Sequence, residues 1–343
     1  MITRSLLAAA LAATSLHADL IEPSEPFDYP SMAFYPDRWE KEGVHELDYV
    51  AWEGEKVALV TTTQELDPKV MTTFVQGLDA GYTLYHELTG YTPRVNKQYK
   101  GKATICALPK RGLSCGYGCG YVGATGIEMT RFYDGHYLGA KKNEKNIPHV
   151  YFYEMGRNYF GFGERHNCFT TGFAVFMRYV CIDTLGMNDG DKRTRRIVDT
   201  AVDRFAENDM TFVGGFTNQG PHGEKGARLK DKDGKPINPS DQNVLYASLM
   251  LKLAKENGGN DFIKEFYKQV WTLPRIKPAN EEAARAQCIN LMIAASLAAD
   301  KDLTPYFADS LKLKVSDKQR KTLAKIKWAD ASLDAGSVSK SVN

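Results

Sequence analysis

The order of apolar segments in the first half of the chain most constrains how it can fold. Residues 57–62 form a short β-branched run, and Asp67 and Pro68 then supply a helix cap with proline at the first helical position. Apolar residues at helical spacing follow until Gly90, which predicts a helix of about five turns that glycine ends. Residues 103–108 and the alternating segment 126–132 predict two further strands. This succession indicates a layer of strands covered by a long helix.

After Pro148 the pattern becomes mostly helical. Pro148 opens a predicted helix over 149–160, and the continuous apolar run 173–185 predicts a buried helix. Ser316 with Gln319 is a capping-box pair that predicts a last helix through Trp328. The chain is therefore expected to combine a mixed α/β part with a helical part, an α+β fold.

We divide the chain by composition and pattern. The predicted parts are a signal peptide (1–18), an irregular arm rich in Pro, Asp, Glu and Tyr (19–55), an α/β subdomain (56–165), a helical subdomain with a long polar loop at 214–241 (166–330), and a flexible tail (331–343).

The first residues have the pattern of an export signal. A charged start at Arg4 precedes the apolar stretch 5–16, and small residues follow before Asp19. This stretch is too short to cross a bilayer, so no membrane span is predicted and the mature protein is expected to be secreted or periplasmic. The formal charge of +2, with acidic and basic residues interspersed, argues against a nucleic-acid partner.

Two of the six cysteines lie close together in the glycine-rich segment 114–120. Cys115 and Cys119 can bridge across this loop, as exported proteins permit. A metal knuckle is the alternative, but it needs two more ligands at similar spacing and none is nearby. The pairing of the other cysteines cannot be read from the sequence.

The densest chemistry lies on the predicted helix 149–160, in the segment Tyr153-Glu154-Met155-Gly156-Arg157. Residues 153 and 157 lie one turn apart on one helix face, with Glu154 beside them. In zinc peptidases written His-Glu-x-x-His, these positions hold two metal-binding imidazoles and the glutamate that activates the metal-bound water. Here the glutamate is present and both histidines are replaced.

This segment resembles the gluzincin clan of zinc metallopeptidases, in particular the secreted branches similar to plant basic secretory proteins and enhancin-like peptidases. In those families the third ligand is a glutamate in a Glu-Gly-Phe/Ile-Ala context, and the matching segment here, 170–179, has Thr171 in its place. The resemblance covers about residues 55–330. It implies a zincin-like α/β subdomain packed on a helical subdomain, with the active-site cleft between them.

The replaced ligands imply a site without zinc. Tyrosine is a poor zinc ligand beside imidazole, and the permanently cationic Arg157 repels a divalent ion, so no metal and no other cofactor is expected. We expect the Arg157 guanidinium to occupy the vacated metal volume and to neutralise Glu154 in a structural ion pair. In the alternative, active interpretation, Glu154 is a general base, and Arg157 with Tyr153 stabilises an anion or an oxyanion.

Other candidate sites depend on fewer observations. His149 and His166 flank the helix and are candidate ligands for a rebuilt metal site with Glu154, although the spacing from His149 to Glu154 splays them apart. The glycine-rich loop 116–123 superficially suggests phosphate binding, but it leads into a strand and not into a helix. In the similar peptidases the strand after such a loop is an edge that pairs with extended substrate. That resemblance implies substrate-binding roles for Gly126, Ile127, Glu128, Met129 and Thr171.

We therefore expect a secreted, metallopeptidase-like protein that binds a peptide or glycan in the cleft without hydrolysing it. One alternative is a hydrolase that uses Glu154 with Arg157 or with a rebuilt metal site. A second alternative is a structural envelope or matrix protein. An open cleft lined by Tyr153, Glu154 and Arg157 favours binding or catalysis, whereas a cleft filled by the aromatic residues of the same helix favours a structural role.

Overall fold

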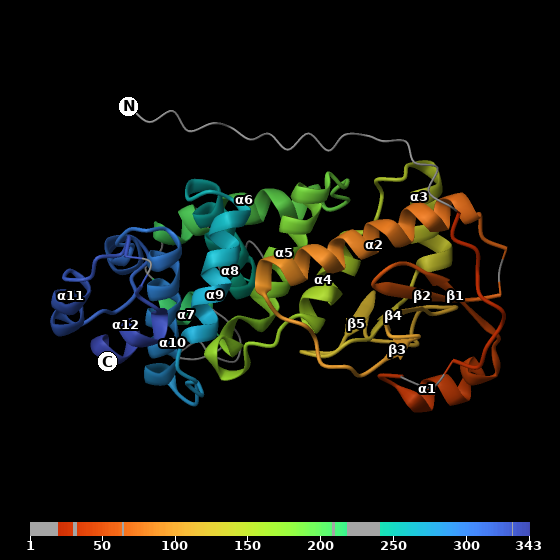
Figure 1. The fold of residues 1–343 in the computed structure, drawn as a ribbon, viewed down its shortest axis with the longest axis horizontal. Helices are drawn as coiled ribbons and strands as arrows, with labels where there is room; N and C mark the ends of the chain where they lie inside the picture. The colour runs from red at the N-terminus through yellow and green to blue at the C-terminus, as the bar shows by residue number, and fades with distance from the viewer. Residues whose placement is uncertain (1–19, 30–32, 64, 208–209, 218–240, 331) are drawn as a thin grey trace.

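The computed structural model of the protein describes residues 20–29, 33–63, 65–207, 210–217, 241–330 and 332–343. A mixed sheet lies at one end of the molecule and a cluster of helices at the other, with the long helix α2 (Pro68–Thr89) running along the sheet (Figure 1). The predicted α+β organisation is thereby confirmed. The expected signal peptide and most of the expected polar loop 214–241 lie outside the described residues.

The sheet has the strand order β1-β2-β4-β6-β5, and the short β3 pairs with β4 on the side. The β2–β4 and β4–β6 pairs are parallel, whereas β1 and β5 run antiparallel to their neighbours. Every residue of β2 is buried, which is why its sequence is a continuous apolar and β-branched run without alternation. The strands are β1 (Tyr49–Glu53), β2 (Val57–Thr62), β3 (Gln98–Tyr99), β4 (Lys102–Ala107), β5 (Gly118–Gly120) and β6 (Ile127–Met129).

Two predictions about the sheet are wrong. The segment 19–55 is not an irregular arm throughout, because it contains the short helix α1 (Pro36–Lys41) and strand β1, which pairs with β2. The segment 126–132 does not form the edge, because β6 lies between β4 and β5. In the part of the chain that the structure describes, β5 ends the strand order on this side.

The helices agree with the capping signals of the sequence. The Asp67 side chain accepts a hydrogen bond from the Lys69 amide at the start of α2, and Gly90 ends this helix in the left-handed conformation. Ser316 and Gln319 form the predicted capping box, although the helix ends at Leu323 and not at Trp328. The remaining helices are α3 (Tyr137–Lys142), α4 (His149–Asn158), α5 (Thr170–Leu185), α6 (Lys192–Ala206), α7 (Phe212–Phe216), α8 (Asp241–Glu256), α9 (Asn260–Thr272), α10 (Glu281–Ala298), α11 (Asp317–Leu323) and α12 (Ala335–Val342).

One hydrophobic core joins the sheet to the helical end. A continuous cluster of buried residues includes Leu59 of β2, Phe152 of α4, Phe176 of α5 and Ile293 of α10. Helices α4 and α5 pack closely because position 156 is glycine: a Cβ there would lie 2.7 Å from the Cα of Ala174. The crossing of α4 and α5 fixes the position of the candidate site between the sheet and the helical end.

The C-terminal segment differs from the predicted flexible tail. Residues 335–342 form α12, whose Val338 and Val342 are buried in the same core. The Asp334 side chain caps this helix by accepting a hydrogen bond from the Ser337 amide. Small polar residues at the chain end therefore concealed an amphipathic helix.

One helical segment of the described residues, Asn167–Leu185, is long and apolar enough to cross a membrane by length and composition alone. Most of it is buried inside the protein, as is common for a core helix. Its apolar sequence is accounted for by packing in the core.

Candidate functional site

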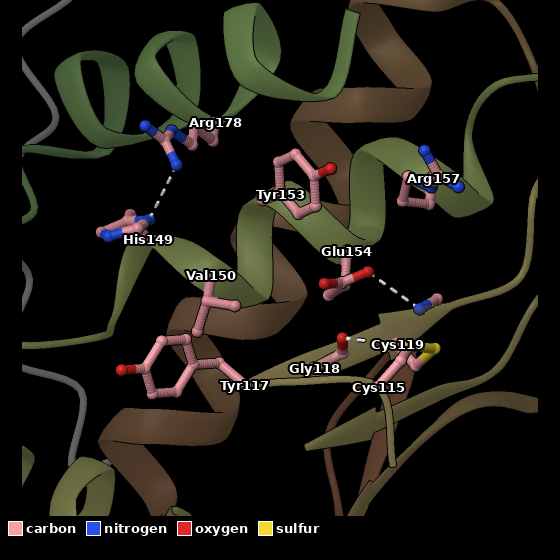
Figure 2. A pocket seen from close by; sticks show the side chains of 11 residues that line it. Cys115, Tyr117, Gly118, Cys119, His149, Val150, Tyr153, Glu154, Arg157 and Arg178 are labelled. Atoms are coloured by element: carbon pink, nitrogen blue, oxygen red, sulfur yellow. Dashed lines mark hydrogen bonds between the residues drawn. A yellow bond between two sulfur atoms is a disulfide. The ribbon is translucent and has the colours of Figure 1, made fainter. Parts of the chain in front are cut away.

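A pocket of about 430 Å³ lies between β5, α4 and α5. Figure 2 shows His149 and Arg178 at one end, Arg157 at the other, and Tyr153 and Glu154 between them. Helices α4 and α5 and strand β5 all contribute residues to the pocket. The pocket forms where α4 crosses the sheet beside β5. The lining residues are Cys115, Tyr117, Gly118, Cys119, Gly120, His149, Val150, Tyr153, Glu154, Arg157 and Arg178.

The glycines of β5 allow α4 to approach the sheet edge closely. A Cβ on Gly120 would lie 2.6 Å from the backbone oxygen of Glu154, so a larger residue cannot fit without displacing the helix. The Gly120 amide instead donates a hydrogen bond to Glu154 Oε2 at 2.8 Å. The predicted disulfide between Cys115 and Cys119 is confirmed and closes the loop that leads into this strand.

Glu154 is a buried carboxyl group at the pocket wall, with 6% of its surface exposed. Burial raises the pKa of Glu154 to about 7, while the Gly120 amide and the Arg157 charge act in the opposite direction. A carboxyl group with this pKa is partly protonated near neutrality. It therefore has the protonation behaviour of a general base or acid at physiological pH.

Arg157 does not make the predicted ion pair. Its Nη1 donates a hydrogen bond to Thr171 Oγ1 at 3.3 Å, and among the described side chains it forms no ion pair with Glu154. The fold thus brings together two positions that carry zinc ligands in the similar peptidases. Here a guanidinium and a hydroxyl meet in place of a histidine and a glutamate.

The third such position is Tyr153, whose pKa is raised by burial. Tyrosine, arginine and threonine are not a donor set that suits Zn²⁺, and a guanidinium at one ligand position repels the ion. Within the described ranges, no group of three or more His, Cys, Asp or Glu side chains is placed to hold a metal. The residues at the three ligand positions therefore do not fit zinc.

The structure does not bring His149 and His166 together with Glu154. His166 lies in the helical core, where its Nε2 is 2.6 Å from the Tyr246 hydroxyl and burial lowers its pKa to about 3. His149 lines the pocket, but its Nδ1 contacts Arg178 Nη1 at 3.2 Å. A metal site rebuilt from both histidines is thus ruled out by their positions.

Arg178 is a pocket residue to which sequence reasoning assigned no role. It projects from α5, where it is 9% exposed, and its Nη2 donates a hydrogen bond to the Tyr179 hydroxyl at 2.7 Å. A single arginine within the apolar run 173–185 was the available signal. Its partner His149 is 29 residues away in sequence, so the contact depends on how α4 and α5 cross.

The predicted substrate-binding segment is not at the edge of the sheet, because its strand β6 lies one strand inside the outer strand β5. Ile127 and Met129 belong to the buried core, and Met129 lies close to Gly118. Glu128 points to the opposite face of the sheet, where its Oε1 accepts a hydrogen bond from the Phe34 amide. The outer strand beside the pocket is β5, so the edge of the sheet here is 118–120 and not 126–129.

The aromatic residues of α4 do not fill the pocket. Tyr151, Phe152 and Tyr159 each have an exposed fraction of 0% and belong to the hydrophobic core. Tyr153, Glu154 and Arg157 line the opening instead. The pocket is therefore open and is not filled by these core aromatic residues.

Comparisons with known proteins show a similarity to solved structures. No family model matches the sequence, and no curated protein matches it. The fold is similar to a metallopeptidase from Bacteroides thetaiotaomicron, with 14% identity and a TM-score of 0.47. The match covers 78% of this chain and 42% of that protein's chain, so this chain spans less than half the length of its structural neighbour.

Proposed function

We propose that this protein is an exported, metallopeptidase-like binding protein that holds an extended peptide in the pocket lined by β5, α4 and α5, without zinc-dependent hydrolysis. The observation that carries the proposal is the open pocket beside the outer strand β5, with Tyr153, Glu154 and Arg157 exposed to it. An outer strand offers backbone hydrogen bonds to an extended chain, and neighbouring side chains supply selectivity. The disulfide Cys115–Cys119 supports an oxidising compartment, secreted or periplasmic.

The charge of the pocket supports a ligand with polar or anionic groups. Arg157 and Arg178 both line it, and among the described residues neither forms an ion pair with a carboxylate. A volume of about 430 Å³ is within the range of small-ligand sites and holds a few residues of a peptide. A purely structural protein has no need of such an opening.

A hydrolase is the second candidate, and the pKa of Glu154 favours it. With a pKa of about 7, the carboxylate can accept a proton from a water molecule that attacks a carbonyl carbon. Arg157 or Tyr153 would then donate a hydrogen bond to the developing oxyanion. Proton transfer from Glu154 to the leaving amine would complete the cleavage.

One set of assays separates these candidates. A pool of synthetic random-sequence peptides is incubated with the purified mature protein, and binding, cleavage and bound zinc are measured by affinity capture, mass spectrometry and elemental analysis. We expect retained, uncleaved peptides and no stoichiometric zinc. Cleavage that disappears in Glu154→Gln would establish the hydrolase instead, and stoichiometric zinc in the unmutated protein would overturn the metal-free proposal. Arg157→His tests whether a restored imidazole brings zinc back.

Val150→Trp tests whether the pocket itself is the binding site. Val150 lines the pocket, so an indole there fills its volume, and we expect peptide affinity to fall at least about 10-fold. Val95→Trp is the matched control, because Val95 is 67% exposed and lies outside the pocket. Equal binding by both variants would place the peptide elsewhere.

A further inference from the structure

Arg178 is a buried cation that lines the pocket with incomplete hydrogen bonding. It is 9% exposed, and its Nε is buried without a hydrogen-bond partner among the described residues. Its Nη1 and Nη2 are used by His149 and Tyr179, and its Cζ lies 4.6 Å from the centre of the Tyr179 ring. Among the described residues this guanidinium has no direct ion pair, so a bound anion can supply one.

His149 orients Arg178 at this end of the pocket. Arginine can only donate, so His149 Nδ1 must accept the hydrogen bond from Arg178, which leaves the proton of the neutral ring on Nε2. Burial and the Arg178 charge both lower the pKa of His149, which keeps the ring neutral at physiological pH. The ring therefore offers an N–H group on a residue that lines the pocket.

Two aspartates act electrostatically on this pair, and each accepts a backbone hydrogen bond, although Asp189 Oδ2 is buried without a partner among the described residues. Asp191 caps α6 by accepting a hydrogen bond from the Thr194 amide, and Asp189 Oδ1 accepts one from the Asp191 amide. Both carboxylates act on the pKa of His149, but neither forms an ion pair with Arg178 within the described residues. Tyr153, one turn further along α4, also lines the pocket and is uncharged at neutral pH.

We propose that Arg178 and His149 form a carboxylate-binding subsite for the peptide ligand, at the end of the pocket opposite Arg157. The planar guanidinium matches the two oxygens of a carboxylate, and the hydrogen bond to His149 Nδ1 holds the guanidinium in place. The carboxylate is either the C-terminus of the peptide or an Asp or Glu side chain. This inference rests on the proposed function, because it names the group that a pocket-bound peptide presents.

Calorimetry on the full mature protein tests the subsite with one peptide in three forms. The probes are an N-acetylated Ala-Val-Thr-Ala peptide with a free C-terminus, its C-terminal amide, and the amide with one alanine replaced by glutamate. Loss of a charge-assisted hydrogen bond weakens binding by about 10- to 100-fold. We expect the amide to bind that much more weakly than at least one of the carboxylate forms. A free C-terminus that binds more tightly assigns the main-chain carboxylate, and the glutamate form that binds more tightly assigns the side chain.

Arg178→Met should remove the difference between the acid and amide forms, and Arg178→Lys should restore part of it. Arg195→Met is the matched control. Arg195 lies over the same Tyr179 ring at 5.0 Å but pairs with Asp183 and Asp199 and does not line this pocket. The comparison of peptide forms on the unmutated protein stands even if Arg178→Met fails to fold.

Equal binding of all three forms to the unmutated protein overturns the subsite and leaves the proposed function intact. Persistence of the acid–amide difference in a folded Arg178→Met protein also overturns it. Absence of any peptide binding overturns both. Glucuronic acid is the last probe: Arg178-dependent binding of this sugar acid without peptide binding would replace the peptide by an acidic glycan.

Discussion

Glu154 and Glu128 lie on opposite faces of the sheet beside β5 and β6, and their immediate surroundings are closely matched. Each carboxyl group is buried, each accepts a backbone amide hydrogen bond of 2.8 Å, and burial raises the pKa of each to about 7. Glu154 faces a pocket with Arg157, whereas Glu128 is enclosed under the N-terminal segment and has an exposed fraction of 0%.

The difference between the two glutamates shows that a raised carboxyl pKa indicates function only in certain surroundings. Raised carboxyl pKa values are common at active sites, but burial alone produces the same shift in a structural position. What separates these two glutamates is access for a ligand and the presence of cationic neighbours. Glu154 has both, and Glu128 lies close to Cys106, Tyr29 and Tyr49 instead.

The largest expected change in stability comes from opening the buried side of the sheet around Glu128. Tyr49 is 1% exposed, and its hydroxyl donates a hydrogen bond to the Val44 carbonyl oxygen at 3.1 Å. Tyr49→Ala should lower the free energy of unfolding by about 3–5 kcal/mol and admit water beside Glu128. The pKa of Glu128 should then fall while that of Glu154 does not, as measured by carboxyl ¹³C titration in NMR. Tyr49→Phe keeps the ring and should leave both pKa values in place; an equal fall at both glutamates would contradict the comparison.

The pH dependence of stability gives the next largest effect. Each glutamate has a folded pKa of about 7, above the reference value of 4.5, so the folded state retains a proton that the unfolded state releases. The stabilising contribution of each group is therefore complete below pH 4.5 and is lost as the pH rises towards 7 and above, by roughly 3 kcal/mol. Denaturant unfolding of the unmutated protein and of Glu128→Gln across this pH range measures the difference.

Glu128→Gln should remove the part of the pH-dependent loss of unfolding free energy that Glu128 causes. Glu154→Gln should remove a part of similar size. The double variant should then show the sum of the two changes, because the residues lie on opposite faces of the sheet. A slope in Glu128→Gln that equals that of the unmutated protein would mean that Glu128 titrates normally.

Much of the α/β layer could be predicted because its signals are local. The boundaries of α2 depend on Asp67, Pro68 and Gly90, and each of these residues acts within a few positions of itself. The Cys115–Cys119 disulfide is predictable for the same reason. Residue type and spacing also pointed to the segment around Glu154, whose side chains line the pocket.

The missed features depend on contacts between distant segments. Strand β1 lies in a region rich in Pro, Asp and Glu, and its pairing with β2 makes it a strand. The outer strand β5 is Gly-Cys-Gly, which has low strand propensity and is held by pairing with β6. The Arg178 contact with His149 exists because α4 and α5 cross, which no local pattern encodes.

The smallest expected change in stability comes from moving β5 away from α4 on the side of the sheet that faces the pocket. Gly120→Ala places a Cβ 2.6 Å from the backbone oxygen of Glu154, and overpacking of this kind costs about 1–3 kcal/mol of unfolding free energy. The strand should shift outward, lengthen the amide hydrogen bond to Glu154, and admit water to its carboxyl group.

Two changes then act on the pKa of Glu154: hydration lowers it, and loss of the Gly120 hydrogen bond raises it. Burial is the largest cause of the present shift, so the net change should be downward, with Glu128 unaffected. Gly139→Ala in helix α3 is the control, since the nearest atom to a Cβ there is the Cβ of Asn146 at 4.0 Å, and it should leave both pKa values unchanged. A rise of the Glu154 pKa would show that the Gly120 amide outweighs burial. The two glutamates would then differ in the strength of their hydrogen bonds as well as in their access to ligand.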